Sequence, residues 1–274
     1  MTSLRGILEG GVRPKKSLGQ NFLADPVYLR KIAESVELAR DDLVLEIGPG
    51  TGNLTEHLLA GAGRVIAVEL DRRMVEHLHK RFASAENLTL VLGDILAVGL
   101  PELLRPWLNR FAAYKVAANL PYYLTSAILR MLLESPIRPA LAALTVQWEV
   151  AQRICAQPGD MSLLAVAVQW YAVPRIVTRI PAGAFTPVPK VDSAVLRLEM
   201  RSRPVAAIPS EEALFRAARA GFSQRRKQLR NALSAGLRLK PVEAENILRG
   251  VGIDPTRRAE TLSLDEWAAL SRVV

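Results

Sequence analysis

Short apolar runs and helical patterns alternate along the N-terminal half of the chain. The apolar runs read as buried strands and cover residues 43–47, 64–70, 88–92, 114–118 and 141–147. Apolar residues at spacings of three and four follow the first run, as in Leu54 and Leu58, which is typical of a helix with one buried face. Buried strands that alternate with amphipathic helices predict a mostly parallel sheet covered by helices.

Strand-like patterns continue toward residue 200. Residues 163–170 and 175–180 are rich in β-branched and aromatic residues, and turn signals lie before the first and between the two. This pattern predicts an antiparallel hairpin at the edge of the sheet. A last strand is expected over residues 194–200, so that the fold class is α/β with an antiparallel edge.

The composition changes to that of a linker over residues 201–209, and only helical patterns follow. One helix is expected around residues 214–222 and a second, with a dense cationic face, from residues 224–231 onward. A third covers residues 241–249, and Ser263-x-x-Glu266 is a capping box for a fourth. We therefore expect two domains, residues 1–203 and a small all-helical domain of residues 204–274.

The charge of the chain is unevenly distributed. The net charge is +9 over 274 residues, and most of it lies in residues 1–31 and 181–274. A near-neutral body with basic flanks favours nucleic acid as the partner. The single Cys155 excludes an internal disulfide, and no apolar run is long enough to span a membrane. With no secretory signal in the first residues, we expect a cytoplasmic protein.

A glycine-rich turn, Gly-Pro-Gly-Thr-Gly, follows the first strand at residues 48–52. Gly48 and Gly50 let a ligand approach the backbone, and the following helix offers free N–H groups. Asn53 replaces the last glycine of the dinucleotide fingerprint. Glu69 and Asp94 end or follow the next two strands, where they suit a ribose and an adenine amine. Together these residues predict an adenosine site without a pyrophosphate, for which S-adenosylmethionine is the expected cofactor.

Asn119-Leu120-Pro121-Tyr122 stands where the fourth strand should end. Ligands of open α/β sheets bind just beyond the carboxyl ends of the strands. The Asn119 oxygen can accept a hydrogen bond from an exocyclic amine, and Tyr122 can stack on a flat base. The alternative is a turn with a tyrosine that covers the core. The tetrapeptide predicts chemistry on the amine of a base.

Motifs over nearly the whole chain resemble those of the ribosomal RNA adenine N6-dimethyltransferases. They lie at residues 16–23, 46–52, 68–71, 93–94, 119–122, 185–193 and 222–227. The resemblance is strongest to the branch that dimethylates two adjacent adenosines near the 3′ end of small-subunit RNA. One departure is Trp148, where the family usually has lysine, and it concerns a surface or RNA contact rather than the chemistry.

The resemblance implies a Rossmann-like class I methyltransferase fold and the small ribosomal subunit as partner, and we expect a monomer. It also implies that Asn21 and Leu23 close over the cofactor. In the mechanism we expect, the Asn119 oxygen and the Leu120 carbonyl accept the two N–H groups of adenine N6. Tyr122 and Phe185 would enclose a base flipped out of the RNA, and no metal is needed. Basic residues at both ends are expected to contact RNA: Arg13, Lys15, Lys16, Arg225, Arg226, Lys227 and Arg230.

Three other functions remain open from the sequence. A large-subunit methylase of the same family would share every catalytic motif. A non-catalytic RNA-binding assembly or transcription factor could keep the fold, although the intact glycine turn, Glu69, Asp94 and Asn119 argue against lost catalysis. A NAD-linked dehydrogenase is disfavoured by Asn53.

Overall fold

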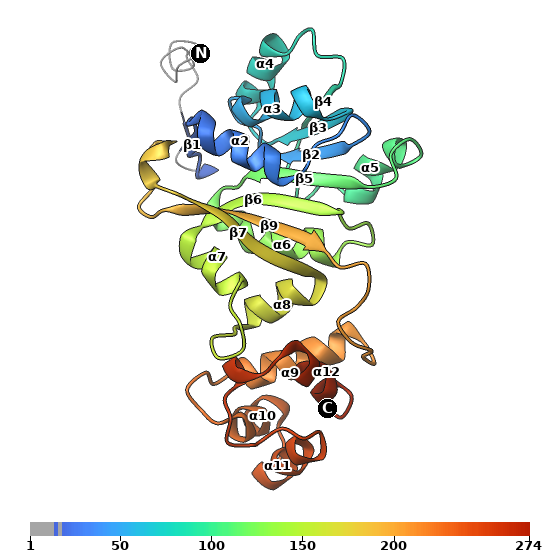
Figure 1. Cartoon of the computed structure of the whole chain (residues 1–274), viewed down its shortest axis with the longest axis vertical. Coiled ribbons are helices and arrows are strands. Elements are labelled where there is room, and N and C mark those ends of the chain that lie inside the picture. The colour runs from blue at the N-terminus through green and yellow to red at the C-terminus, as the bar shows by residue number, and fades with distance from the viewer. Residues whose placement is uncertain (1–13, 16–17) are drawn as a thin grey trace. The chain divides into compact units, whose positions relative to one another are not determined.

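Seven strands form one sheet in the order β4-β3-β2-β5-β6-β9-β7, in the computed structural model that describes residues 14–15 and 18–274. The strands of this sheet are β2 Leu43–Ile47, β3 Arg64–Glu69, β4 Leu88–Leu92, β5 Tyr114–Asn119, β6 Leu141–Gln147, β7 Ala172–Ile180 and β9 Ser193–Met200. Neighbours from β4 to β6 run parallel, whereas β9 pairs antiparallel with β6. The expected α/β fold with a mostly parallel sheet and an antiparallel edge is confirmed (Figure 1).

Helices connect these strands and cover the sheet. They are α2 Pro26–Ser35, α3 Asn53–Gly61, α4 Arg72–Arg81, α5 Leu100–Leu108, α6 Thr125–Glu134 and α7 Trp148–Ile154. Asp25 caps α2 by accepting from the Val27 N–H at 2.9 Å, and Pro26 is its first residue. α2 packs against α3, and their apolar faces share one buried cluster with alternate residues of the strands, such as Val44, Val65 and Ala117.

The strand order reverses between β2 and β5, which run parallel side by side. The connection from β2 leads toward β3 on one side, while the connection from β5 leads toward β6 on the other. A crevice therefore opens beyond the carboxyl ends of these two strands, which is where open α/β sheets bind ligands. The glycine turn follows β2 and Asn119 ends β5, so that both predicted motifs meet at this crevice.

A second, two-stranded sheet pairs the N-terminal arm with a distant loop. Strand β1, Phe22–Leu23, runs antiparallel to β8, Phe185–Thr186, with Leu23 opposite Phe185. The Ala24 N–H also donates to the Ala184 carbonyl at 3.3 Å. This pairing holds the arm beside the large sheet.

The predicted hairpin over residues 163–180 is wrong in its first half. Leu163–Tyr171 is helix α8, and the Ser162 hydroxyl caps it by accepting from the Ala165 N–H at 3.1 Å. Six of its nine residues are buried, so the helix is apolar on most sides. For this reason its sequence shows no clear helical period. The second half is confirmed as strand β7, which lies at the sheet edge next to β9.

The chain divides into two compact units by its internal contacts. One comprises the residues up to Ala151 together with Arg175–Met200, and the other comprises Gln152–Pro174 and Arg201–Val274. The expected boundary at residue 203 does not account for α8. This helix precedes the boundary in the sequence, but it packs against the C-terminal helices and so belongs to their unit. The Tyr171 and Phe215 rings, for example, lie 6.2 Å apart.

The C-terminal helices enclose their own small core. They are α9 Glu211–Phe222, α10 Leu229–Leu237, α11 Pro241–Gly250 and α12 Leu264–Ser271. Trp267 is fully buried and approaches the backbone of α9 so closely that a Cβ on Gly221 would lie 2.5 Å from its ring. The predicted capping box of α12 is confirmed, since the Ser263 hydroxyl accepts from the Glu266 N–H and the Glu266 carboxylate accepts from the Ser263 N–H.

The second predicted helix begins later than expected. Arg225, Arg226 and Lys227 lie in an exposed turn, and α10 starts at Leu229, which is fully buried. The helix starts where its buried face begins, and that face consists of Leu229, Ala232 and Leu233. The preceding residues are a run of like charges and have no apolar face to bury. None of the helices within residues 14–15 and 18–274 is long and apolar enough to cross a membrane.

Candidate functional site

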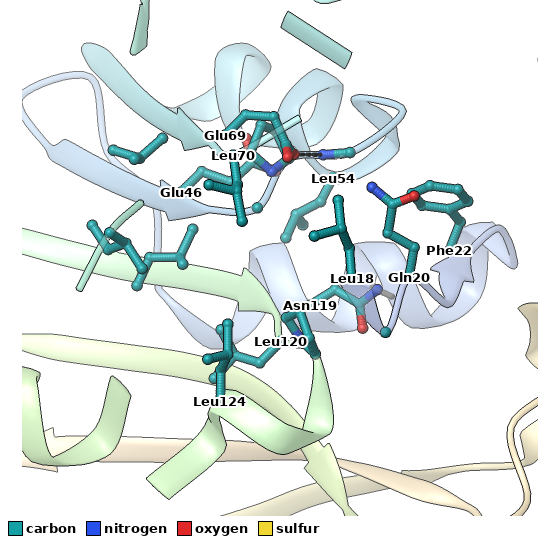
Figure 2. A pocket seen from close by; sticks show the side chains of 18 of the residues that line it. Leu18, Gln20, Phe22, Glu46, Leu54, Glu69, Leu70, Asn119, Leu120 and Leu124 are labelled. Atoms are coloured by element: carbon teal, nitrogen blue, oxygen red, sulfur yellow. Dashed lines mark hydrogen bonds between the residues drawn. The ribbon is translucent and has the colours of Figure 1, made fainter. Parts of the chain in front are cut away.

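A pocket lies at the carboxyl ends of β2 to β5 in the unit that contains the large sheet. Its walls are the glycine turn, the ends of β3 and β4, the tetrapeptide and the arm over residues 18–23. Figure 2 shows Glu46 and Glu69 on one side of this pocket and Asn119 with Leu120 on the other. The structure thus brings together all seven residues that were predicted to bind the cofactor: Asn21, Leu23, Gly48, Gly50, Glu69, Asp94 and Asn119.

The glycine turn takes backbone conformations that other residues rarely adopt. Gly48, Gly50 and Gly52 have φ values of 68°, 56° and 82°. A Cβ on Gly50 would lie 2.9 Å from the Phe22 ring, so glycine lets the arm pack on the turn. A Cβ on Gly48 would meet nothing within 4 Å, and Gly48 lines the pocket. The space next to Gly48 is therefore open to a ligand that approaches the backbone.

Glu69 is held in one orientation by backbone donors. One carboxylate oxygen accepts from the Gly50 N–H at 3.0 Å and the other from the Asp71 N–H at 2.8 Å. The residue is 6% exposed, and burial raises the pKa of its carboxyl, while those two N–H groups oppose the rise. Each oxygen has a second lone pair, so the fixed carboxylate can still accept from two neighbouring hydroxyls.

Asp94 lies at the mouth of the pocket. Its side chain is exposed, and one carboxylate oxygen accepts from the Leu96 N–H at 2.9 Å. No residue of the described chain engages the other oxygen. The turn thus orients a carboxylate at the pocket with one oxygen left for a donor such as an amine.

Glu46 is a site residue that the sequence analysis missed. It lies in β2, is 1% exposed and lines the pocket. Neither carboxylate oxygen accepts a hydrogen bond within the described part of the chain. Burial raises its pKa to about 8; the Thr55 hydroxyl opposes the rise and the Glu69 charge adds to it. A carboxylate inside an otherwise apolar strand, directly before the glycine turn, was the available signal.

Asn119 has its carboxamide oriented by the arm. Its Nδ2 donates to the Asn21 carbonyl oxygen at 3.0 Å, and Asn21 in turn donates to the Gly19 carbonyl at 3.3 Å. The amide nitrogen of Asn119 therefore faces the arm, and its oxygen remains to accept from a ligand in the pocket. Leu120, 2% exposed, also lines the pocket.

Tyr122 and Phe185, the two rings expected to enclose a base, do not line the pocket of the described chain. Phe185 is 1% exposed and belongs to the core cluster under α2 and α3, because β8 turns it inward opposite Leu23. The Tyr122 hydroxyl shares a 2.6 Å hydrogen bond with the Ser193 hydroxyl. The aromatic residues that line the pocket within the described chain are instead Phe22 and Tyr123, and Tyr123 is 60% exposed.

The basic residues of the arm are only partly described. Arg13 and Lys16 lie outside the described residues. The Lys15 ammonium is 3.7 Å from Asp71, whose carboxylate also pairs with Arg73 at 2.6 Å. In this arrangement Lys15 helps to hold the arm near the end of β3.

The predicted basic residues of the other unit differ among themselves. Arg225, Arg226 and Lys227 are exposed in their turn. Arg230 lies on α10, where its guanidinium pairs with Glu245 at 3.2 Å. The turn thus presents its cations to solvent, whereas Arg230 also serves the packing of α10 against α11.

Trp148 replaces the usual lysine with a ring that holds another cation. The Arg179 guanidinium lies 5.0 Å from the centre of its indole and pairs with Asp192 at 2.7 Å. The Trp148 N–H donates to the Asp192 carbonyl at 3.0 Å. The positive charge at this place comes from Arg179 in the present chain.

The residues around the pocket fit S-adenosylmethionine. Glu69 offers two fixed oxygens for ribose hydroxyls, and Asp94 offers one for an exocyclic amine. The unpartnered oxygens of buried Glu46 suit an ammonium, and the open space at Gly48 gives room against the backbone. A Rossmann-like sheet with this pocket at its switch point defines the class of S-adenosylmethionine-dependent methyltransferases.

Comparison with known proteins places the chain within this class. Residues 11–273 match the family model of ribosomal RNA adenine dimethylase. The Ribosomal RNA small subunit methyltransferase A of Moorella thermoacetica is 46% identical over 98% of this chain and 95% of its own. That of Bacillus mycoides is 40% identical over 95% of this chain and 91% of its own. The chain belongs to the ribosomal RNA adenine dimethylase family.

Solved structures agree with this assignment. A dimethyladenosine transferase from Plasmodium falciparum has a TM-score of 0.77 at 26% identity, over 91% of this chain and 95% of its own. The 23S rRNA methyltransferase ErmE has a TM-score of 0.73 at 29% identity, over 92% of this chain and 99% of its own. The family carries out S-adenosylmethionine-dependent dimethylation of rRNA adenine. The dehydrogenase alternative is thereby excluded.

Proposed function

We propose that the protein dimethylates N6 of two adjacent adenosines near the 3′ end of small-subunit ribosomal RNA and so takes part in subunit biogenesis. The observation that carries this proposal is the orientation of Asn119, whose amide nitrogen is engaged by the Asn21 carbonyl at 3.0 Å. Its oxygen is then available to the amine of a base. The choice of the small subunit follows the names of relatives at 40–46% identity.

Positioning of the amine is the main catalytic contribution of the chain. The cofactor, when bound, supplies an electrophilic methyl group. The Asn119 oxygen and the Leu120 carbonyl accept the two N–H groups of adenine N6, which favours a pyramidal nitrogen with its lone pair toward the methyl group. Transfer of the methyl group from the bound cofactor would leave N6 cationic, and this nitrogen would then lose a proton to water. Holding two reactants in this way can lower a barrier by several kcal/mol, roughly 7–11 in favourable cases.

The enzyme is proposed to act as a monomer. Ribosomal subunits assemble in the cytoplasm of bacteria, and we place the protein there. RNA contacts are assigned to the arm and to the exposed turn Arg225–Arg226–Lys227. The RNA-binding domain is formed by the C-terminal helices, which lie within residues 204–274.

The subunit preference can be measured directly. Transfer of tritium from labelled cofactor should occur to small subunits from cells that lack the protein. The methylated positions should map to two adjacent adenosines near the 3′ end. Label in the large subunit alone would instead identify the chain as a large-subunit methylase, the activity named for ErmE.

The exposed turn can be tested through the salt dependence of subunit binding. Replacing Arg225, Arg226 and Lys227 together by Ala should weaken binding and reduce the salt slope by roughly one unit per lost phosphate contact. Cofactor affinity should stay unchanged. A matched control removes three other exposed cations of the same unit, Arg216, Arg219 and Arg249. Equal salt slopes for both triple variants would show that the turn is only a solvated surface.

A further inference from the structure

Two asparagine side chains hold neighbouring carbonyls of the arm. Asn119 donates to the Asn21 carbonyl at 3.0 Å, and Asn53 donates through Nδ2 to the Leu23 carbonyl at 3.2 Å. Asn53 is the first residue of α3 and lines the pocket directly after the glycine turn. One short segment of the arm is thus bound to both the cofactor side and the catalytic tetrapeptide.

The amide of Asn53 is fixed from its other end by Arg81. The Arg81 guanidinium donates to the Asn53 Oδ1 at 3.0 Å and to the Thr51 carbonyl at 2.5 Å. Glu56 pairs with the same guanidinium at 2.6 Å. Because Oδ1 faces Arg81, the NH₂ group must face the arm, so both ends of the carboxamide are used.

Few other hydrogen bonds hold the arm. Strand β1 has only two residues, and isolated strand pairs of that length are weak. On the cofactor side the Phe22 ring packs on Gly50, and the Gln20 amide and the Lys15 ammonium reach the Asp71 carboxylate, just after β3, at 3.5 and 3.7 Å. The link from Asn53 to Leu23 is therefore a large share of what fixes the arm to the glycine turn.

We propose that Asn53 is a positioning residue of this methyltransferase. Through the series Arg81–Asn53–Leu23 it couples the shape of the glycine turn to the place of the arm, and through Asn21 to the orientation of Asn119. The inference rests on the activity of the family and is independent of which ribosomal subunit is the substrate. Asn53 also stands where the dinucleotide fingerprint has its last glycine. A glycine there would have no side chain to donate to the Leu23 carbonyl.

Two substitutions separate the arm contact from the contact with Arg81. Asn53→Asp keeps an oxygen for Arg81 but replaces the donor to Leu23 by a second oxygen. Asn53→Ala removes both contacts. If Asn53 positions the arm, both variants should lose this positioning to the same extent. If Asn53 only holds the glycine turn through Arg81, Asn53→Asp should behave like wild type.

The first readout needs neither RNA nor cofactor. Amide hydrogen exchange of residues 18–24 in the free protein should be faster in both variants than in wild type. The affinity for S-adenosylhomocysteine, measured by calorimetry, should fall by roughly 5- to 20-fold, the range for one lost hydrogen bond at a site. At saturating cofactor, single-turnover methyl transfer should fall on the order of 10-fold with unchanged subunit binding, because Asn119 is less well oriented.

Asn87→Asp is the matched control. Asn87 donates to the Leu59 and Ala62 carbonyls at 3.2 and 3.1 Å, at the other end of α3, and it does not line the pocket. This variant should lower Tm without changing arm exchange or cofactor affinity. Wild-type arm exchange and affinity in Asn53→Asp would overturn the proposal, as would equal effects of Asn53→Asp and Asn87→Asp. Since amide exchange and S-adenosylhomocysteine affinity are measured without the subunit, a wrong substrate assignment leaves these two readouts unaffected.

Discussion

The two halves of the pocket are built differently. On the cofactor side, Gly48 and Glu69 belong to consecutive strand ends, and backbone N–H groups hold the carboxylate. On the base side, Asn119 depends on the Asn21 carbonyl, far away in the sequence, while Tyr122 bonds to Ser193. The donors that hold Glu69 thus lie within 19 residues of it, whereas Asn119 and Tyr122 depend on partners in the arm and in β9 that are 98 and 71 residues away. Substitutions in the base half should therefore act mainly on the chemistry.

The largest effect is expected for Asn119→Ala. Loss of one oriented acceptor at the reacting amine should lower single-turnover methyl transfer on the order of 10²–10³-fold at saturating cofactor and subunit. A direct binding assay should show that the subunit still binds, since the phosphate contacts are proposed to lie in the arm and in the turn Arg225–Arg226–Lys227. A wild-type rate would mean that the tetrapeptide is structural, and the difference between the halves would then disappear.

Glu46→Gln tests the unpartnered acid of the cofactor half. The folded-state pKa of Glu46, about 8, lies above its ordinary value of 4.5. The neutral form is favoured in the folded protein, so wild type should lose unfolding free energy as pH rises from the ordinary value through about 8. The slope contributed by this one group is at most about 1.4 kcal/mol per pH unit. Glu46→Gln should show a flatter profile in denaturant titrations from acid to mildly basic pH, and identical profiles would contradict the assignment.

Glu69→Ala and Asp94→Ala compare two acids within the cofactor half. Each should weaken S-adenosylmethionine binding by roughly 1–3 kcal/mol, because each leaves a polar group of the ligand unpaired. The loss for Glu69 should be the greater, since its carboxylate is buried and fixed by two N–H groups while Asp94 is exposed. Calorimetry gives both values, and wild-type affinity in both variants would remove the adenosine site.

The smallest effects concern the rings of the base half. Tyr123→Ala should weaken the holding of the flipped base by about 1 kcal/mol, the lower end for a base stacked on an aromatic side chain, because its ring is exposed. Tyr122→Phe keeps the ring but loses the bond to Ser193. Subunit KM and kcat of the two variants, with Tyr122→Ala beside them, show which ring the base uses. A larger loss in Tyr122→Ala than in Tyr123→Ala would mean that Tyr122 leaves Ser193 to meet the base.

The sequence was sufficient where the signal was local. Strands such as Leu141–Gln147 have apolar runs that match their burial on both faces. Because consecutive parallel strands end at the same edge of a sheet, the glycine turn, Glu69 and Asn119 could be expected at one site before any coordinates were known. The capping box of α12 was also confirmed, since it depends on residues within one turn of the helix.

Local patterns were not sufficient where burial came from distant segments. Leu163–Tyr171 is apolar on most sides, so its period did not distinguish helix from strand, and its packing with the C-terminal helices decided for a helix. The start of α10 was decided in the same way by the buried Leu229.

The sequence by itself determined the family, the cofactor and the residues that meet at the strand ends. Only the tertiary structure decided which rings line the pocket, that Glu46 is buried there without a partner in the described chain, and that Asn53 binds the arm. The physical reason is that burial and hydrogen-bond partners are properties of the packed chain. The motif over residues 185–193 does not reveal whether the Phe185 ring faces the base or the core. The pairing of Phe185 with Leu23 turns the ring into the core.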